Sequence, residues 1–153
     1  MEKNDRTPRE KPYDLRKRLF FFACLIVRVV QFLHTLDPVA RRLSYQVLDS
    51  GTSAGANYEE ADSGSSARDT LAKRKIVLRE LKETRFRLLV LRESGYLPPA
   101  QDAVIQETTE LMNIVGALIE HLGVKRHQLR AGLRSAPRSV RRFLGSLEFG
   151  VWS

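Results

Sequence analysis

One set of polar residues in this chain is spaced so that its members could meet across two helices. Asn57 and Glu60 are three residues apart and therefore share one face of a helix. In an antiparallel hairpin, that face would meet polar side chains of the following helical segment. The whole set combines one hydroxyl, one amide, one ammonium and three carboxylates: Ser50, Asn57, Glu60, Lys73, Glu80 and Glu83.

This polar set has a functional and a structural interpretation. As a functional site it would bind a ligand or catalyse a reaction. As a structural feature it would be a buried network that fixes the register of two helices, as a single core Asn does in coiled coils. We favour the structural interpretation, because no nucleophile, acid and base converge there as catalysis requires. Asn57 is then expected to be buried and paired.

A second set of residues is basic and repeats at helical spacing. Its members are separated by seven, four and three residues: Arg68, Lys75, Arg79 and Lys82. Within one subunit the stripe is expected to be a solvated face balanced by neighbouring carboxylates. In a symmetric assembly, however, the repeated stripe would make a large positive surface. Contacts from such a surface to phosphates add up in charge and depend on salt, so the stripe is a candidate site for nucleic acid.

The basic character of the chain is concentrated near its C-terminus. The net charge is +8, and residues 123–153 hold seven Lys and Arg against Glu148. Phe143, Phe149 and Trp152 could stack on bases or be buried. Residues 140–147 could form a short amphipathic helix that docks on a partner, lies on an anionic membrane or folds back, and disorder before Pro137 is also open. We expect nucleic-acid contacts here from Lys125, Arg126, Arg130, Arg141 and Arg142.

The sequence contains no motif that would bind a metal or a cofactor. Di-iron helical bundles use Glu-x-x-His pairs, but the residues three places before His34, His121 and His127 are not glutamates. One Cys, Cys24, allows neither an intrachain disulfide nor a cysteine-rich zinc site. We therefore expect a protein without metal or cofactor that is not an enzyme.

Composition indicates one globular domain in a reducing compartment. The 153 residues are 42% hydrophobic and 29% charged, which suits a packed core. The apolar run at 19–30 follows three basic residues, as in a signal peptide, but Arg28 interrupts it and no small-residue cleavage site follows. We expect a cytoplasmic protein with no membrane partner.

Hydrophobic periodicity predicts four helices. The first starts near Leu15 and carries two apolar stripes, so it is either central in the bundle or buried against another subunit. Asp37 and Pro38 start the second, which runs to about Asp62 and carries small residues where a core is expected. These small residues allow a neighbouring backbone to approach closely.

The third and fourth helices are bounded by turn and capping residues. The third spans 67–94 after a serine-rich break and ends before Gly95 and two prolines, although a weak break would join it to the second helix as one bent rod. The fourth spans 100–122, with Gly123 as its C-cap. The sequence thus predicts an all-α, up-and-down antiparallel four-helix bundle at 14–122, between a charged arm at 1–13 and a basic tail at 123–153.

Residues 46–91 closely resemble the family called four-helix bundle proteins, or 23S rRNA intervening-sequence proteins. The resemblance covers about residues 15–122 and rests on Ser50–Ser53, Gly55–Asn57 and Glu60–Ala61, followed by Lys73, Glu80 and Glu83 at the family's offsets. The family includes accessory proteins of diversity-generating retroelements. The resemblance implies a pentameric ring without known catalytic activity, which in retroelements binds nucleic acid and a reverse transcriptase.

Two parts of the chain depart from the family pattern. Many relatives have an aromatic pair where this chain has Arg85-Phe86, so the packing or a partner surface there differs. The segment 123–153 is longer than the family core requires. We expect a homo-oligomeric, non-enzymatic protein, pentameric in the family's pattern, that binds RNA or DNA and serves a reverse transcriptase. The alternative is a protein scaffold whose basic tail engages an acidic partner.

Overall fold

The computed structural model describes residues 14–63 and 66–135, all of whose regular structure is helical. Its elements are α1 (Leu15–His34), α2 (Pro38–Asp62), α3 (Ala67–Glu93), a 3₁₀ turn η1 (Pro99–Gln101) and α4 (Asp102–Ser135). The chain divides into two compact units at Gly116, and α4 crosses the boundary. The four α-helices within the described ranges confirm the predicted all-α, four-helix class.

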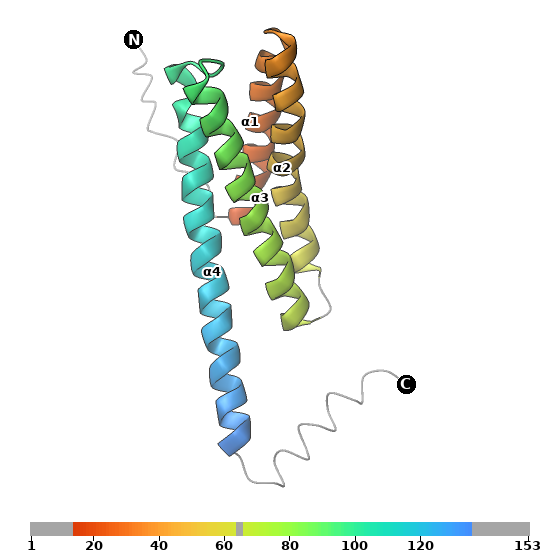
Figure 1. The fold of residues 1–153 in the computed structure, drawn as a ribbon. Coiled ribbons are helices and arrows are strands. Elements are labelled where there is room, and N and C mark those ends of the chain that lie inside the picture. Colours follow the sequence, from red (N-terminus) through yellow and green to blue (C-terminus); the bar gives the residue numbers. More distant parts are fainter. Residues whose placement is uncertain (1–13, 64–65, 136–153) are drawn as a thin grey trace, which may run out of the picture. The chain divides into compact units, whose positions relative to one another are not determined.

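The first unit is an antiparallel arrangement of helices joined by short connections (Figure 1). α2 packs along both α1 and α3. Polar contacts tie the beginning of α4 to α1 through Arg18 and Glu107, and to α3 through Arg85 and Thr109. α1 and α3 are therefore separated from each other by α2 and α4.

Local capping sets the helix ends in the first unit. Asp37 accepts hydrogen bonds from the amides of Val39 and Ala40, both at 2.9 Å, with Pro38 as the first helical residue. The hydrogen bond from the Ala40 amide is the main cause that lowers the pKa of the Asp37 carboxyl below its ordinary value. The bonds from the Tyr96 hydroxyl and the Val39 amide lower it further. The cap predicted from the Asp-Pro pair is confirmed.

The break between α2 and α3 is a true helix boundary. The Ser66 side chain caps α3 by accepting from the Asp69 amide at 3.2 Å, and its hydroxyl donates to the Asp69 carboxylate at 2.6 Å. The alternative of one bent rod through α2 and α3 is therefore wrong. α3 ends where Gly95 adopts a φ of +79°, which lets the amides of Gly95 and Tyr96 reach the carbonyls of Arg92 and Leu91.

Small residues in α2 bring α1 close, as predicted. A Cβ on Gly51 would lie 2.8 Å from two side-chain carbons of Ile26, so only glycine fits without a shift. The buried face of α2 is rotated slightly from the predicted stripe. Leu43 and Asn57 of the predicted stripe are half-buried, whereas their neighbours Ser44 and Tyr58 are buried. The expected burial of Asn57 is therefore wrong.

α1 buries one of its two apolar stripes within the described chain. Its buried residues are Leu19, Phe22, Ile26, Val29, Val30 and Leu33. On the other stripe Phe21 is 59% exposed, and its neighbour Phe20 is 63% exposed. The other described helices therefore do not enclose α1 on all sides.

α4 continues well beyond its predicted end at Leu122. It passes through Gly123 and reaches Ser135, so Gly123 is not a C-cap. The physical reason is that one Gly costs about 1 kcal/mol relative to Ala, while the Lys, Arg, Gln, Leu and Ala residues that follow are good helix formers. Of the described side chains at 117–125, which lie in the second unit, each is half-buried or exposed.

Candidate nucleic-acid interface

The predicted basic stripe forms an exposed ridge on α3, which we call the α3 ridge. Its basic members, Arg68, Lys75, Arg79 and Lys82, are all exposed. The ridge lies on one side of the helix because its spacings match the helical repeat, and the opposite side supplies the buried Val77, Leu81 and Leu88. From residue 68 to residue 82 the ridge is about 21 Å long at 1.5 Å per residue.

The charge on this ridge is only partly neutralised within the described chain. α3 as a whole carries nine Lys and Arg and four Asp and Glu. On the ridge, Arg79 lies 3.1 Å from the Glu80 carboxylate and 3.9 Å from that of Glu83. Among residues 14–63 and 66–135, no ion pair is found for the side chains of Arg68, Lys75 or Lys82. Three cations of the ridge thus face solvent.

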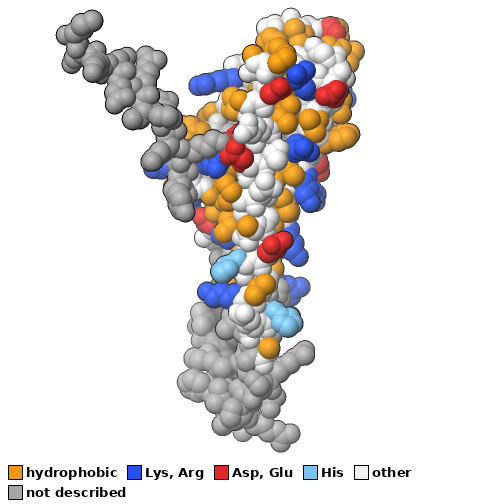
Figure 2. Space-filling view, turned by 90° about the vertical axis from the view of Figure 1, so that its left-hand side faces the viewer, with side chains coloured by type: hydrophobic (Ala, Val, Ile, Leu, Met, Phe, Trp, Pro, Cys, Tyr) orange, Lys and Arg blue, Asp and Glu red, His pale blue; other side chains and the backbone are white. Residues whose placement is uncertain are grey.

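A groove between α2 and α3 adjoins the ridge at Lys82. Phe86, four residues after Lys82, continues the ridge and is 67% exposed. The groove has a volume of about 460 Å³ and is lined by Leu43, Gln46, Lys82, Glu83, Phe86, Arg87 and Val90. On the face drawn in Figure 2, Lys and Arg side chains are likewise interspersed with exposed hydrophobic ones. Sequence reasoning missed Phe86 as a site residue, although its departure from the family pattern pointed to this place.

The predicted polar set does not form one network. The Ser50 hydroxyl donates to the Gln46 carbonyl at 2.9 Å and lies 2.9 Å from the buried hydroxyl of Thr84 across the α2–α3 interface. The Asn57 amide donates to the Ser53 carbonyl of its own helix at 2.9 Å. The buried polar contact across α2 and α3 is therefore made by Ser50 and Thr84, and Asn57 has no part in it.

The charged members of the polar set lie in two separate places. Lys73 pairs with Glu60 across the α2–α3 interface, where both side chains are substantially exposed. Glu80 and Glu83 instead pair along α3, with Arg79 and with Arg87. Of these charged residues, only Lys73 and Glu60 connect α2 with α3, and the described members of the set do not converge on one site.

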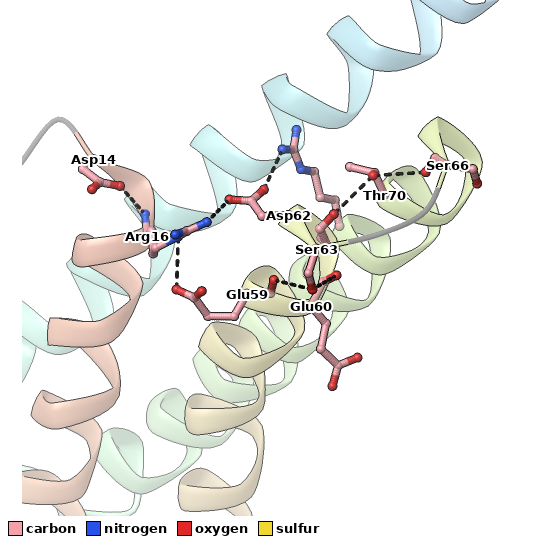
Figure 3. A network of polar contacts seen from close by, with 10 residues as sticks. Asp14, Arg16, Glu59, Glu60, Asp62, Ser63, Ser66 and Thr70 are labelled. Carbon is pink, nitrogen blue, oxygen red and sulfur yellow. Dashed lines mark hydrogen bonds and ion pairs between the residues drawn. The ribbon is translucent and has the colours of Figure 1, made fainter. Parts of the chain in front are cut away.

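Ion pairs that sequence reasoning did not predict connect the helices at one end of the first unit (Figure 3). The Arg16 guanidinium on α1 lies 3.2 Å from the Glu59 carboxylate and 2.7 Å from that of Asp62, both on α2. Asp62 in turn lies 3.4 Å from Arg74 of α3, whose guanidinium is 5.5 Å from the centre of the Tyr58 ring. This network ties α1, α2 and α3 together.

A more buried ion-pair cluster joins α1 to α4. Arg18 is only 13% exposed, and its guanidinium contacts Glu107 at 2.6 and 2.9 Å and Glu110 at 2.6 Å. The hydrogen bond to Glu107 raises the pKa of Arg18 above its ordinary value, against the opposing effect of burial, and the bond to Glu110 adds to the rise. The signal in the sequence was the i, i+3 carboxylate pair on α4, which one guanidinium can bridge.

The basic residues predicted beyond the first unit are described only in part. Lys125 is exposed on α4. Arg126 and Arg130 belong to the same helix, but their side chains lie outside the described residues, as do Arg141 and Arg142 altogether. Within the part of the chain that the structure describes, no group of His, Cys, Asp and Glu could hold a metal ion. Over the same residues, none of the helices offers an apolar stretch sufficient to span a lipid bilayer.

Among the solved structures that resemble this chain is one that is also similar to it in sequence. It is a protein of unknown function from the S23 ribosomal protein family of Bacteroides thetaiotaomicron, known from a crystal structure. The two chains are 30% identical and superpose with a TM-score of 0.64, over 69% of this chain and 98% of the relative. The chain belongs to the S23 ribosomal protein family. No family model matches it, and no curated protein does.

Membership in the S23 ribosomal protein family accounts for the helical bundle. The match spans nearly the whole of that relative. The relative is itself a protein of unknown function.

Proposed function

We propose that this family member is a non-enzymatic, self-assembling protein that binds RNA or DNA. The observation that carries the proposal is the α3 ridge, whose exposed cations Arg68, Lys75 and Lys82 have no carboxylate partner within the described ranges. A polyanion is the ligand that such a ridge fits, because each bound phosphate releases counterions on binding. The name of the family, that of a ribosomal protein, accords with a nucleic-acid partner.

Assembly is the second part of the proposal. A single ridge of four basic residues binds nucleic acid weakly at physiological salt, whereas a ring repeats the ridge in every subunit. The exposed Phe20 and Phe21 on α1 supply an apolar surface for this assembly, on a different helix from the ridge. The resemblance of residues 46–91 is the basis for two finer proposals. One is a ring of five subunits, and the other is a role as accessory factor to the reverse transcriptase of a diversity-generating retroelement.

A salt-dependent binding experiment tests the proposal. Fluorescent RNA and DNA are titrated with the intact protein at several salt concentrations, with Arg79→Glu/Lys82→Glu as the test variant. The double variant should weaken binding to every sequence alike. It should also reduce the slope of log affinity against log salt by about 0.9 for each phosphate that is no longer neutralised on duplex DNA.

The matched control is Arg41→Glu/Arg42→Glu, which makes the same change in net charge at two exposed residues of α2 instead of α3. It should leave most of the affinity in place. If both double variants weaken binding equally, the net charge rather than the α3 ridge is responsible. If the intact oligomer binds neither RNA nor DNA at low salt, the nucleic-acid function is refuted and the alternative of a protein scaffold stands.

A further inference from the structure

The α3 ridge changes character along its length. Its basic part ends at Lys82, and one helical turn later, about 6 Å along the axis, it presents the ring of Phe86. Phe86 is the most exposed of the large hydrophobic side chains in the described ranges. An aromatic face in line with a row of cations is the combination by which proteins hold single strands, because cations follow the phosphates while rings stack on the bases.

The groove beside Phe86 has the size and lining for a flat, uncharged group. Its volume of about 460 Å³ lies within the range of small-ligand sites, about 300–1,000 Å³. Leu43 and Val90 give it apolar walls, and the Gln46 side chain adds an amide that can exchange hydrogen bonds with a base edge. The Arg87 guanidinium is held in place, because it donates to the Gln46 carbonyl at 3.1 Å and lies 3.1 Å from the Glu83 carboxylate.

The charges around the groove separate the place of a base from that of its phosphate. Of the three charged residues that line the groove, Glu83 and Arg87 pair with each other at 3.1 Å and offset each other's charge. Lys82 has no carboxylate partner in the described ranges and, with Arg79, attracts a phosphate to the ridge. A nucleotide would therefore have its phosphate beside Lys82 and its base in the groove against Phe86.

We propose that Phe86 and the α2–α3 groove bind an unpaired nucleobase, so that this protein prefers single-stranded nucleic acid to a duplex. The inference rests on the proposed function and names the class of nucleic acid. In a duplex the bases are stacked and paired, so only the backbone can use the ridge. In a single strand each base can also stack, which contributes affinity that a duplex lacks.

A second copy of this chain is the competing occupant of the groove. The exposed apolar side chains that could fill it, Phe20 and Phe21 of α1, are accompanied on that helix by the exposed cations Lys17 and Arg28. Docking them beside Lys82 would bring like charges together, which opposes association. A nucleic-acid strand instead neutralises the same cations, so charge complementarity favours it.

The test compares single strands with the duplex of the same sequence, using the full chain and variants of Phe86. Phe86→Ala should weaken single-strand binding about tenfold and change duplex binding less than about twofold. Phe86→Tyr keeps the ring and should retain nearly all of the affinity, whereas Phe86→Leu keeps apolar bulk without the aromatic face and should behave like Phe86→Ala. Circular dichroism checks that each variant is folded.

A fluorescence readout reports the stacking directly. Trp152 is the only tryptophan of the chain, so Phe86→Trp in a Trp152→Phe background places a single indole at the groove. Single strands should quench its emission at a concentration that matches their affinity, and the duplex should not.

Three outcomes would overturn the inference. If the Phe86 variants bind single strands and duplex as the intact chain does, while Arg79→Glu/Lys82→Glu weakens both, the base site is refuted and the proposed function survives. If Phe86→Ala changes the mass of the assembly, the groove is an interface between copies. If neither single strands nor duplex bind at low salt, the inference fails together with the proposed function.

Discussion

At the scale of single residues, Gly51 decides how closely α1 and α2 approach. Its missing Cβ would lie 2.8 Å from Cγ1 and Cγ2 of Ile26, atoms next to the Ile26 backbone that no rotation about an outer bond can remove. At Gly55, one turn later, the nearest atom is the Leu19 carbonyl oxygen at 3.7 Å, an ordinary contact. Two glycines on the same helix therefore have different reasons to be there.

Gly51→Ala should lower the thermal midpoint, whereas Gly55→Ala should raise it. Alanine improves helix propensity by about 1 kcal/mol at either site, but overlap with Ile26 costs about 1–3 kcal/mol at residue 51. A net destabilisation of about 1 kcal/mol lowers the midpoint by about 2–4 °C for a chain of this size. Thermal unfolding at one fixed protein concentration measures both variants, because assembly makes the midpoint concentration-dependent.

Ile26→Ala provides the internal check on this explanation, since it removes the two atoms that an added Cβ would meet at 2.8 Å and leaves the Ile26 Cβ at 3.2 Å. In that background Gly51→Ala should become stabilising. If it stays as destabilising as in the intact chain, the contact with Ile26 is not the cause.

At the scale of elements, the Arg18 cluster is the most buried charged contact that joins α1 to α4. One guanidinium contacts two carboxylates that lie three residues apart on α4. Apolar packing alone does not fix the axial offset of two helices as strictly as a bidentate ion pair does. The cluster thus sets the register of α4 against α1 within the first unit.

Arg18→Ala should destabilise the fold by roughly 2 kcal/mol, because it leaves Glu107 and Glu110 without their shared guanidinium in a partly buried place. The thermal midpoint should fall by about 4–8 °C. Arg16→Ala is the matched control, since Arg16 also pairs with two carboxylates but is half-exposed. Its midpoint should change far less, because solvent screens exposed pairs. Equal destabilisation in the two variants would contradict the importance of burial.

At the scale of the whole molecule, the exposed apolar face of α1 has consequences for association. Phe20 and Phe21 contact each other edge to face, with ring centres 5.7 Å apart, and both are more than half exposed. Two adjacent exposed rings on a helix that already buries its other stripe are typical of a protein interface. We therefore expect this face to be covered by a neighbouring copy.

Sedimentation of the intact protein at micromolar concentration should show one species several times heavier than 17.5 kDa. Phe20→Glu/Phe21→Glu should convert it to a monomer of unchanged helix content, because buried carboxylates at the interface are costly. Val39→Glu, also at an exposed apolar residue but on α2, should assemble normally. A monomeric intact protein would refute self-assembly, and unchanged assembly of the double variant would place the interface elsewhere.

The sequence alone determined where most helices begin and end. Asp37 with Pro38, Ser66 and Gly95 act through bonds within a few residues of themselves, so their positions in the chain suffice to locate the ends. The same reasoning failed at Gly123, where a weak local penalty competes with a long run of good helix formers. The hydrophobic periodicity and the capping residues thus predicted the four helices, but not the length of the last one.

Only the tertiary structure decided which side chains meet across helices. Ser50 contacts Thr84 rather than a network through Asn57, and Arg18 finds Glu107 from a basic run that resembled the start of a signal peptide. The exposure of Phe86 beside the α2–α3 groove likewise depends on the rotation of α3. Sequence spacing fixes which residues share a helix face. The rotation and axial offset of each helix are set by packing at sites such as Ile26 against Gly51.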